Sequence, residues 1–370
     1  MSDGFDKEHT VDKRKINKIS TDIYKDLIGR KNSIYTSLII IFSIVVIIVA
    51  YMWINTHEKS VNIADIFNGA NLKYFALMFI CVGVILLINA FSKFIGLYGM
   101  NKQKKFGAIF NSEIKSIFYN KLTTYTKGWI VGGNYLVNRG IALDNSIDIE
   151  LVDRMSEKVA KLLYSFIILA SCGVFCFKRL NVVIFILGVV AFLISVSLIV
   201  FVILFNKKQS KMLEVIASFS GLLYKCRLVK DYEMYYNLLV GKLYAMSRFF
   251  KQKSLISLFQ ILFHIIINVL KVLIIYLFLL SINISGIDVF AELLLNMLMI
   301  DLIVGVLPLP SCLIVCELLF YLLFASMLPS GYIFWALLIY RFFDFYIYII
   351  VYLLTLIADK AVLIVKNKGC

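Results

Sequence analysis

Residues 180–206 read LNVVIFILGVVAFLISVSLIVFVILFN, and this run decides the fold class. It contains 27 residues and no charged side chain, whereas about 20 apolar residues suffice for a helix to cross a bilayer. The run is continuous and does not alternate between apolar and polar residues, which argues against a transmembrane β-barrel. We therefore expect an all-α, polytopic integral membrane protein.

The composition of the whole chain agrees with this expectation. Of the 370 residues, 61% are hydrophobic and 16% are charged, whereas about 25% are charged in a typical soluble domain. These values exclude an ordinary soluble globule, a disordered chain and a secreted disulfide scaffold.

Apolar runs of spanning length recur along the chain and predict about eight membrane segments. They are Ile34–Ile54, Tyr74–Ser92, Val159–Phe177, Leu180–Asn206, Ser254–Ile287, Val289–Leu307, Ser311–Leu328 and Gly331–Ile357. The fifth run is longer than one span needs. We expect it to tilt, or to end before Asn283 and Gly286.

All three prolines lie close together, at Pro308, Pro310 and Pro329. Proline removes a backbone donor and interrupts a helix, and freed backbone groups at membrane depth need partners in protein or water. We interpret Pro308 and Pro310 as a structural break of the kind that lines transporter substrate sites. A simple kinked hairpin is the alternative, and residues 289–328 either span twice or form a re-entrant hairpin.

The distribution of lysine and arginine sets the expected orientation. Residues 1–33, 93–161, 207–253 and 359–370 carry 32 of the 38 basic residues, and the opposite loops carry four. Both termini are therefore expected on the cytoplasmic side. The Asn-, Ile- and Lys-rich composition is typical of an AT-rich bacterial genome, so the expected location is a bacterial plasma membrane.

The expected organisation follows from these boundaries. A cytoplasmic tail (1–33) precedes a membrane domain (34–358), which includes inner segments 98–157 and 207–253, and a second tail (359–370) follows. Met212–Phe250 predicts two amphipathic helices on the inner surface. The net charge of +15 indicates anionic lipid as a partner, in preference to nucleic acid. The oligomeric state stays open, with a homo-oligomer among the alternatives.

No cofactor or metal is expected. Cysteines recur at i, i+4 in Cys172/Cys176 and Cys312/Cys316, but no His or carboxylate pattern completes a metal site, so we interpret them as apolar packing. The chain contains no GxxxxGK[ST], HExxH or GxSxG motif.

Ionisable residues in the C-terminal apolar segments are candidate site residues, because each costs roughly 2.5–3.5 kcal/mol at the helix centre. Arg341 lies ten residues after Gly331, or about 15 Å along a helix. A buried network of Arg341 with carboxylates would partly offset these costs, and Arg341 also suits a lipid phosphate. The candidate carboxylates are Asp301, Glu317 and Asp344.

Lys271 belongs to a polar stripe on an otherwise apolar segment. Gln260, His264, Asn268 and Lys271 recur at i, i+4, i+8 and i+11, which places them on one helix face. We expect this stripe to line a polar pathway. The alternative for Lys271 is to snorkel to the outer surface.

A polar and aromatic stretch, residues 119–134, connects the second and third segments. Its glycines are interpreted as tight turns, and its Thr123 and Lys127 are candidate lipid-binding residues. A re-entrant element and an ordinary inner loop are the two interpretations.

Two blocks resemble the lysylphosphatidylglycerol synthase/flippase transmembrane family. One is Pro308-Leu309-Pro310-Ser311 followed by Glu317, Gly331 and Arg341, and the other runs from Tyr119-Asn120-Lys121-Leu122-Thr123 to Asn138-Arg139-Gly140-Ile141. Both blocks occur in the order of that family, and the resemblance covers about residues 30–360. The chain departs from the pattern where Thr124 replaces a proline, where Trp129 and Ile130 replace a Gln-Pro pair, and where Ser311 and Ile314 replace glycines.

The resemblance implies two activities. Full-length family members join a lipid flippase domain to a soluble domain that transfers lysine from lysyl-tRNA to phosphatidylglycerol, and the cationic product lowers attraction for cationic antimicrobial peptides. The chain ends thirteen residues after the last predicted segment, so we expect no transferase domain. The leading hypothesis is therefore translocation or binding of phospholipid or aminoacyl-phospholipid. The alternatives are a phosphatidylglycerol lysyltransferase, with lysyl-tRNA as the only nucleic-acid partner, and a permease subunit working with a separate ATPase.

Overall fold

The computed structural model describes residues 72–101, 106–122, 128–176, 182–226, 232–306, 314–325, 327–329 and 331–368, with scattered residues between 41 and 56. Within these residues every regular element is a helix, as predicted. The α-helices are α4 (Leu72–Asn101), α5 (Phe106–Leu122), α6 (Gly128–Asn138), α7 (Leu143–Cys176), α8 (Val182–Lys207), α9 (Gln209–Lys225), α10 (Tyr232–Ser247), α11 (Ser254–Ser281), α12 (Ile287–Val306), α13 (Val315–Phe324), α14 (Ile333–Arg341) and α15 (Ile347–Lys368). A 3-10 turn, η2 (Arg248–Phe250), precedes α11, and a π turn, η4 (Phe342–Tyr346), joins α14 to α15.

In the part of the chain that the structure describes, five helical stretches are long and apolar enough to cross a membrane. They are Leu72–Leu97, Val182–Lys207, Ser254–Ser281, Ile287–Val306 and Ile333–Ile357. These stretches confirm the predicted segments at Tyr74, Leu180, Ser254, Val289 and Gly331. Ile34–Ile54 lies mostly outside the described residues, so the total of eight stays a prediction.

The long fifth run ends early, which was one of its two predicted outcomes. Helix α11 stops at Ser281, and the chain then turns through Asn283 (φ 62°) and Gly286 (φ 144°). Both residues adopt positive φ, a conformation that glycine and asparagine tolerate better than other residues.

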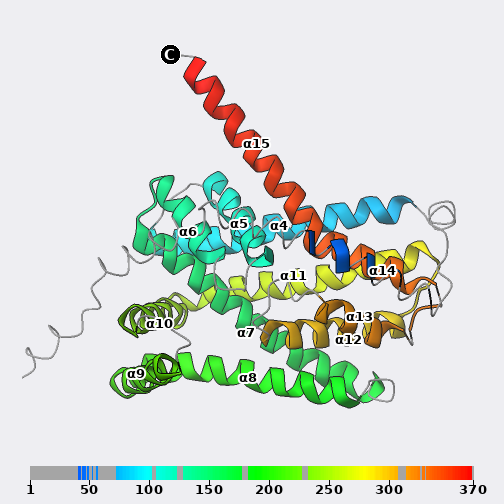
Figure 1. Cartoon of the computed structure of the whole chain (residues 1–370), viewed down its shortest axis with the longest axis horizontal. Coiled ribbons are helices and arrows are strands. Elements are labelled where there is room, and N and C mark those ends of the chain that lie inside the picture. The colour runs from blue at the N-terminus through cyan, green and yellow to red at the C-terminus, as the bar shows by residue number, and fades with distance from the viewer. Residues whose placement is uncertain are drawn as a thin grey trace, which may run out of the picture.

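Helix α7 crosses a boundary that the sequence suggested. It is one continuous helix of 34 residues, in which predicted segment Val159–Phe177 forms the second half. Its first half, which carries most of the charge, belongs to the predicted inner segment 98–157. In Figure 1, α7 runs obliquely from the end that holds α6 toward the start of α8.

Helix α13 (Val315–Phe324) is apolar but short. It has ten residues, or about 15 Å, whereas the hydrocarbon core is about 30 Å thick. The helix within Ser311–Leu328 is therefore too short to cross alone, which favours the re-entrant alternative over a full span. The break at Pro308 and Pro310 lies outside the described residues.

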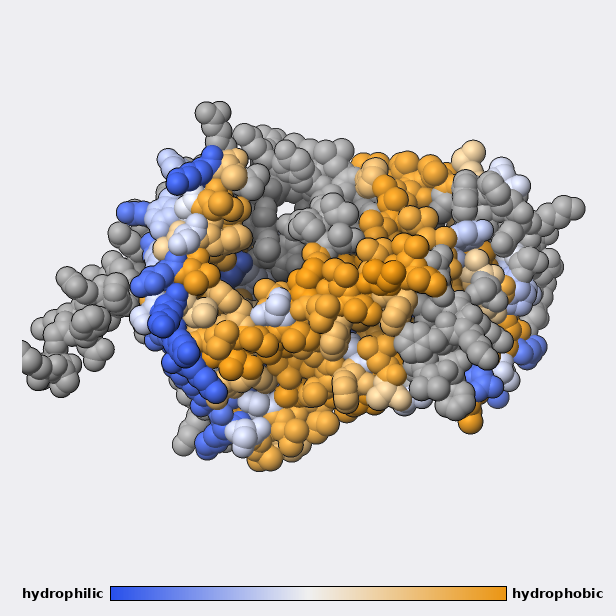
Figure 2. Space-filling model, turned by 90° about the horizontal axis from the view of Figure 1, so that it is seen from below, coloured by the Kyte–Doolittle hydropathy of each residue, from blue (hydrophilic) through white to orange (hydrophobic). Residues whose placement is uncertain are grey.

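The two predicted inner segments meet at one end of the molecule. Helices α5, α6, α9 and α10 gather there, while α4, α8 and α11 extend toward the opposite end (Figure 1). Figure 2 shows a hydrophilic rim at this end and a broad apolar belt beside it. The predicted pair of helices in Met212–Phe250 is present as α9 and α10, and α9 exposes Val215, Phe219 and Leu222. An exposed apolar stripe on a basic surface helix suits a position at the membrane surface.

The main core joins α4, α7, α8, α11, α12, α13 and α14. Its centre contains fully buried aromatic and aliphatic side chains, among them Phe278, Ile300 and Phe320. Helix α11 packs along α4, and together they form one wall of the polar cavity that follows.

Candidate functional site

A polar cavity of about 120 Å³ lies among the packed helices. Side chains from α4, α5, α7, α11, α12, α13, α14, η4 and α15 line it, so it is bounded by segments that are far apart in the sequence. Its volume is enough for several water molecules. Four predicted site residues, Lys271, Asp301, Arg341 and Asp344, line this one cavity.

Arg341 forms the predicted ion pair with Glu317. Its Nε donates to Oε1 of Glu317 over 2.6 Å, and both side chains are buried. Arg341 Nη2 and Glu317 Oε2 have no hydrogen-bond partner among the described residues. The pair therefore keeps one unused donor and one unused acceptor, which is expensive in a buried position.

Asp344 pairs with Lys121 of α5 over 2.6 Å. Arg341 is the last residue of α14, and Asp344 is the third residue of η4, the π turn that follows it. A π turn contains one extra residue and is frequent at functional sites. Here the turn lets the two side chains line one cavity while each reaches a partner on a different helix. We refer to Lys121, Lys271, Asp301, Glu317, Arg341 and Asp344 as the Arg341 cluster.

The predicted stripe on α11 faces the protein interior. Gln260, His264 and Asn268 are buried, and the last two line the cavity with Lys271. Lys271 and Asp301 also border an adjoining cavity of about 20 Å³. Asn268 Nδ2 has no hydrogen-bond partner among the described residues.

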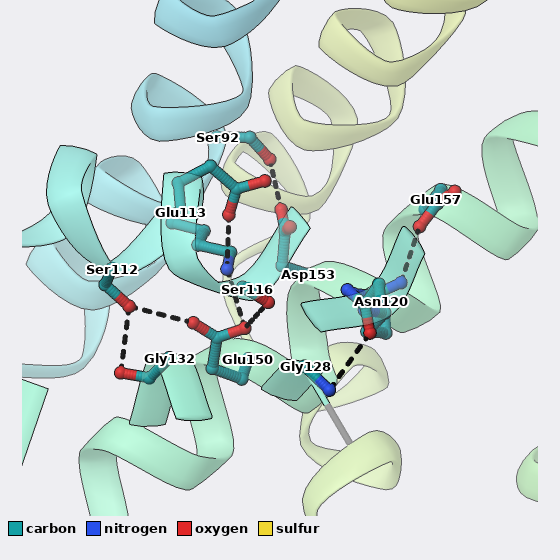
Figure 3. Close-up of polar contacts among 12 residues, drawn as sticks. Ser92, Ser112, Glu113, Ser116, Asn120, Gly128, Gly132, Glu150, Asp153 and Glu157 are labelled. Atoms are coloured by element: carbon teal, nitrogen blue, oxygen red, sulfur yellow. Dashed lines mark hydrogen bonds and ion pairs between the residues drawn. The ribbon is translucent and has the colours of Figure 1, made fainter. Parts of the chain in front are cut away.

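A second charged group lies around Lys93 of α4. Its Nζ forms ion pairs with Glu113 of α5 and, over 2.6 Å, with Glu150 of α7. The hydroxyl of Ser116 donates to Glu150 over 3.1 Å, and the single proton of the Ser112 hydroxyl is shared between Glu150, at 3.1 Å, and the carbonyl of Gly132, at 2.9 Å. Figure 3 shows these side chains converging from three helices. Glu150 is completely buried, and these donors replace its hydration.

Asp153 continues this group toward α11. Ser92 Oγ donates to its Oδ1 over 2.5 Å, and His264 Nε2 lies 3.1 Å from the same oxygen. Gln260 Nε2 donates to the Ser92 carbonyl over 3.2 Å. We refer to Ser92, Lys93, Ser112, Glu113, Ser116, Glu150, Asp153 and His264 as the Lys93 cluster.

A family model described as the lysylphosphatidylglycerol synthase transmembrane region matches residues 40–351. The chain belongs to this family. No curated protein and no solved structure matches the chain. The match covers both clusters and the cavity, so the site described here lies within the lysylphosphatidylglycerol synthase transmembrane region.

The glycines of residues 119–134 do not form tight turns, so that interpretation was wrong, whereas Gly140 at the end of the same block lies in a turn with φ 81°. Gly128, Gly132 and Gly133 lie in helix α6. A Cβ atom on Gly132 would come within 2.4 Å of Glu150 Oε1. Glycine is needed there because the α6 backbone, whose Gly132 carbonyl accepts from Ser112 over 2.9 Å, approaches the buried carboxylate closely.

In the second family block, Ile314 and Gly331 both have positive φ. Gly331 has φ 89°, and Ile314, where the family pattern has a glycine, has φ 69° and ψ −52°. A β-branched residue is strained in this region. Ile314 immediately precedes α13, the helix that carries Glu317.

Burial and neighbouring charges shift the acids of α7 in opposite directions. Burial raises the pKa of Glu150, and the charge of Lys93 opposes this rise. For Glu157, burial would also raise the pKa, but Lys161 and Arg154 lower it well below its usual value. Glu157 lies 3.1 Å from Lys161 and 3.7 Å from Arg154.

Sequence reasoning missed the Lys93 cluster because the charges of residues 93–161 were used only to set orientation. A signal was present: Glu150, Asp153, Glu157 and Lys161 recur at helical spacing on one face, and Ser92-Lys93 interrupts an apolar run.

The predicted site residues Thr123 and Lys127 lie outside the described residues. Within the described part of the chain, no three His, Cys, Asp or Glu side chains are grouped to hold a metal ion.

Proposed function

We propose that this chain binds the headgroup of a phospholipid or aminoacyl-phospholipid in the cavity and moves the lipid between leaflets of a bacterial plasma membrane. Both termini would lie on the cytoplasmic side. Outward movement of a cationic aminoacyl-lipid would make the outer surface less negative and reduce its attraction for cationic peptides. Membership of the lysylphosphatidylglycerol synthase transmembrane family supports the lipid class.

The observation that carries this proposal is a charged cavity with unused hydrogen-bonding atoms. Arg341 and Asn268 line it, and each has one donor nitrogen without a partner among the described residues. Arginine matches the geometry of a phosphate. Asp301 and Asp344 line the same cavity and suit the ammonium groups of an aminoacyl headgroup. A headgroup with charges of both signs therefore complements the lining.

The basic rim supports the same proposal at the membrane surface. Helix α9 combines lysines with the exposed apolar residues Val215, Phe219 and Leu222. Such a helix binds anionic lipid through charge and inserts its apolar side chains among the acyl chains. Phosphatidylglycerol would thus be concentrated at the end of the molecule that holds α9 and α10.

Reconstitution into proteoliposomes tests the proposal. Fluorescent phosphatidylglycerol and lysylphosphatidylglycerol are placed in one leaflet, and their appearance in the other leaflet is followed by quenching of the fluorophore. We expect faster translocation than in empty vesicles, and at least about a tenfold loss in Arg341→Gln, equivalent to about 1.4 kcal/mol. Arg248→Gln is the matched control, because Arg248 pairs with Asp148 and neither residue lines the cavity. Equal rates in all vesicles would contradict the proposal.

A lipid extract distinguishes the transferase alternative. The chain is expressed alone in a host without aminoacylated phospholipids, and lysylphosphatidylglycerol is sought by mass spectrometry. We expect none despite good membrane expression. Its appearance would identify the chain as a synthase. The third alternative, a permease subunit, predicts that a nucleotide-binding protein copurifies with the chain and contacts α9 and α10.

A further inference from the structure

The Asp153–His264 pair has an arrangement that the proposed lipid binding does not require. Both side chains are buried and both line the cavity. One ring nitrogen of His264 lies 3.1 Å from Asp153 Oδ1, and Ser92 Oγ reaches the same oxygen. His264 comes from α11 and Asp153 from α7, so the pair joins two helices that both line the cavity and pack against each other.

An imidazole–carboxylate pair has two stable protonation states. The imidazole either is neutral or carries a proton as an imidazolium held by the carboxylate, and imidazole is the side chain that changes charge between pH 5 and 8. Because the two groups are in contact, the proton bound by one depends on the charge of the other. The pair can therefore take up one proton while the contact between Asp153 and His264 is kept.

The charges that face this pair come from every helix packed around it. Protonation is opposed by the cations Lys93 of α4, Lys121 of α5, Arg154 and Lys161 of α7, Lys271 of α11 and Arg341 of α14. It is favoured by the carboxylates Glu113 of α5, Glu157 of α7, Asp301 of α12 and Asp344 of η4, all of which line the same cavity. Charges of both signs surround the pair. The local field consequently depends on whatever charge occupies the cavity.

A polar route connects the pair with the Arg341 cluster. Along α11, His264, Asn268 and Lys271 follow one another on the cavity side, and they cover about 10 Å at 1.5 Å per residue. Asn268 Nδ2 is buried without a partner among the described residues, and the cavity holds room for water. A water molecule on this amide would place a proton carrier between the two clusters.

We propose that the Asp153–His264 pair binds one proton in each transport cycle, so that a proton gradient drives movement of the headgroup through the cavity. The proton adds to a ring nitrogen of His264 and later leaves to water in the cavity. This inference rests on the proposed function and adds its energy source. Binding of a charged headgroup at the Arg341 cluster would change the proton affinity of the pair, and protonation would in turn change headgroup affinity.

Proton binding is tested first without reference to transport. The full chain, labelled with 13C-histidine, is placed in nanodiscs and titrated from pH 5 to 9 by NMR. The chain has three histidines, so His264→Gln assigns the signal. We expect the His264 signal to shift across this range and its midpoint to move in Asp153→Asn but not in Asp148→Asn, a matched change on the same helix. A signal that stays constant, or that is insensitive to Asp153→Asn, would overturn the proposal.

Coupling is tested in the proteoliposomes with an imposed pH difference of two units and a pH-sensitive dye in the lumen. Lipid translocation by the wild-type chain is expected to rise at least about fivefold, with proton movement into or out of the lumen. His264→Gln is expected to lose this acceleration and Asp148→Asn to keep it. Translocation at one rate with and without the gradient would overturn the coupling and leave the proposed function standing. No translocation under either condition, with an intact His264 titration, would overturn the proposed function and the coupling with it.

Discussion

The two charged clusters on the cavity differ in how completely their buried groups are bonded. In the Lys93 cluster, Glu150 accepts from Lys93, Ser112 and Ser116, and Asp153 accepts from Ser92 and lies beside His264. Glu113 Oε2 has no hydrogen-bond partner among the described residues, but it forms an ion pair with Lys93. In the Arg341 cluster, the ion pair keeps an unused atom on each partner. The backbone differs in the same sense, because the Arg341 cluster contains a π turn and the strained Ile314 beside α13.

This difference separates a scaffold from a site that receives a ligand. A buried charged group whose hydrogen bonds are all made within the protein holds helices in place. A buried charged group with an unused donor or acceptor is stabilised by a ligand that makes the missing hydrogen bond. We therefore assign helix positioning and proton binding to the Lys93 cluster and headgroup binding to the Arg341 cluster. Three substitutions test this division, from the largest expected effect to the smallest, and a fourth at Glu157, outside both clusters, gives the scale of a partly exposed ion pair.

Arg341→Ala is expected to destabilise the protein most, by about 3–5 kcal/mol, because it leaves the Glu317 carboxylate buried without its cation. The double variant Arg341→Met/Glu317→Leu removes both charges and is expected to recover most of that stability while translocation stays lost. Unfolding in detergent and the proteoliposome assay measure the two effects. A double variant that still moves lipid would show that the pair is only structural.

Gly132→Ala tests the close packing of the Lys93 cluster. The added Cβ would lie within 2.4 Å of Glu150 Oε1, and we expect a loss of about 1–3 kcal/mol from overpacking. Gly107→Ala in α5 is the control, because no atom lies within 4 Å of its added Cβ; it is expected to stabilise by about 0.5–1 kcal/mol. Equal melting temperatures for the two variants would contradict a tightly packed scaffold.

Ile314→Gly tests whether strain belongs to the Arg341 side. Ile314 is exposed and has φ 69°, so glycine relieves strain of about 1 kcal/mol without removing buried surface. We expect a higher melting temperature in detergent. Ile314→Val keeps the β-branch and should give no gain; a lower melting temperature for Ile314→Gly would remove the strain argument.

Glu157→Gln gives the smallest effect, below about 1 kcal/mol, because Glu157 is part of a partly exposed ion-pair group. Lys161 and Arg154 hold the pKa of the folded carboxyl below the unfolded value of about 4.3. Its contribution to stability is therefore present above that pH and is lost as the pH falls through the folded pKa. Melting temperatures from pH 3 to 8 should show the full wild-type advantage above about pH 5 and a decline of that advantage below the unfolded pKa of about 4.3. A pH-independent difference would exclude this cause.

Much of the membrane fold was predictable, because the length of an apolar run in the sequence predicts the length of the membrane helix. Helices α8 and α12 follow directly from their runs, and the inward face of α11 follows from the spacing of Gln260, His264 and Asn268. The spacing also brought Arg341 and its carboxylates forward as candidates. The shortness of α13 could be posed only as one of two alternatives, since proline marks a break but not the path after it.

The Lys93 cluster was not predictable in this way, because its bonds join distant segments. Lys93 and Glu150 are 57 residues apart, and Asp153 and His264 are 111 apart. Periodicity tells which residues share a helix face, but not which faces meet. Charges counted in a presumed surface connection therefore became buried once α5, α6 and α7 packed against α4 and α11.

The π turn at Phe342–Tyr346 has a consequence for the shape of the last apolar segment. One extra residue in the turn rotates everything after it by about 100° relative to an uninterrupted helix. Helix α14 thus keeps its buried face against the bundle, whereas α15 leaves the bundle at an angle in Figure 1 and exposes Leu353, Leu354 and Ile357. A single stretch of chain in this way provides both a fixed wall for the cavity and a lipid-facing arm, whose length can change in evolution without altering the wall.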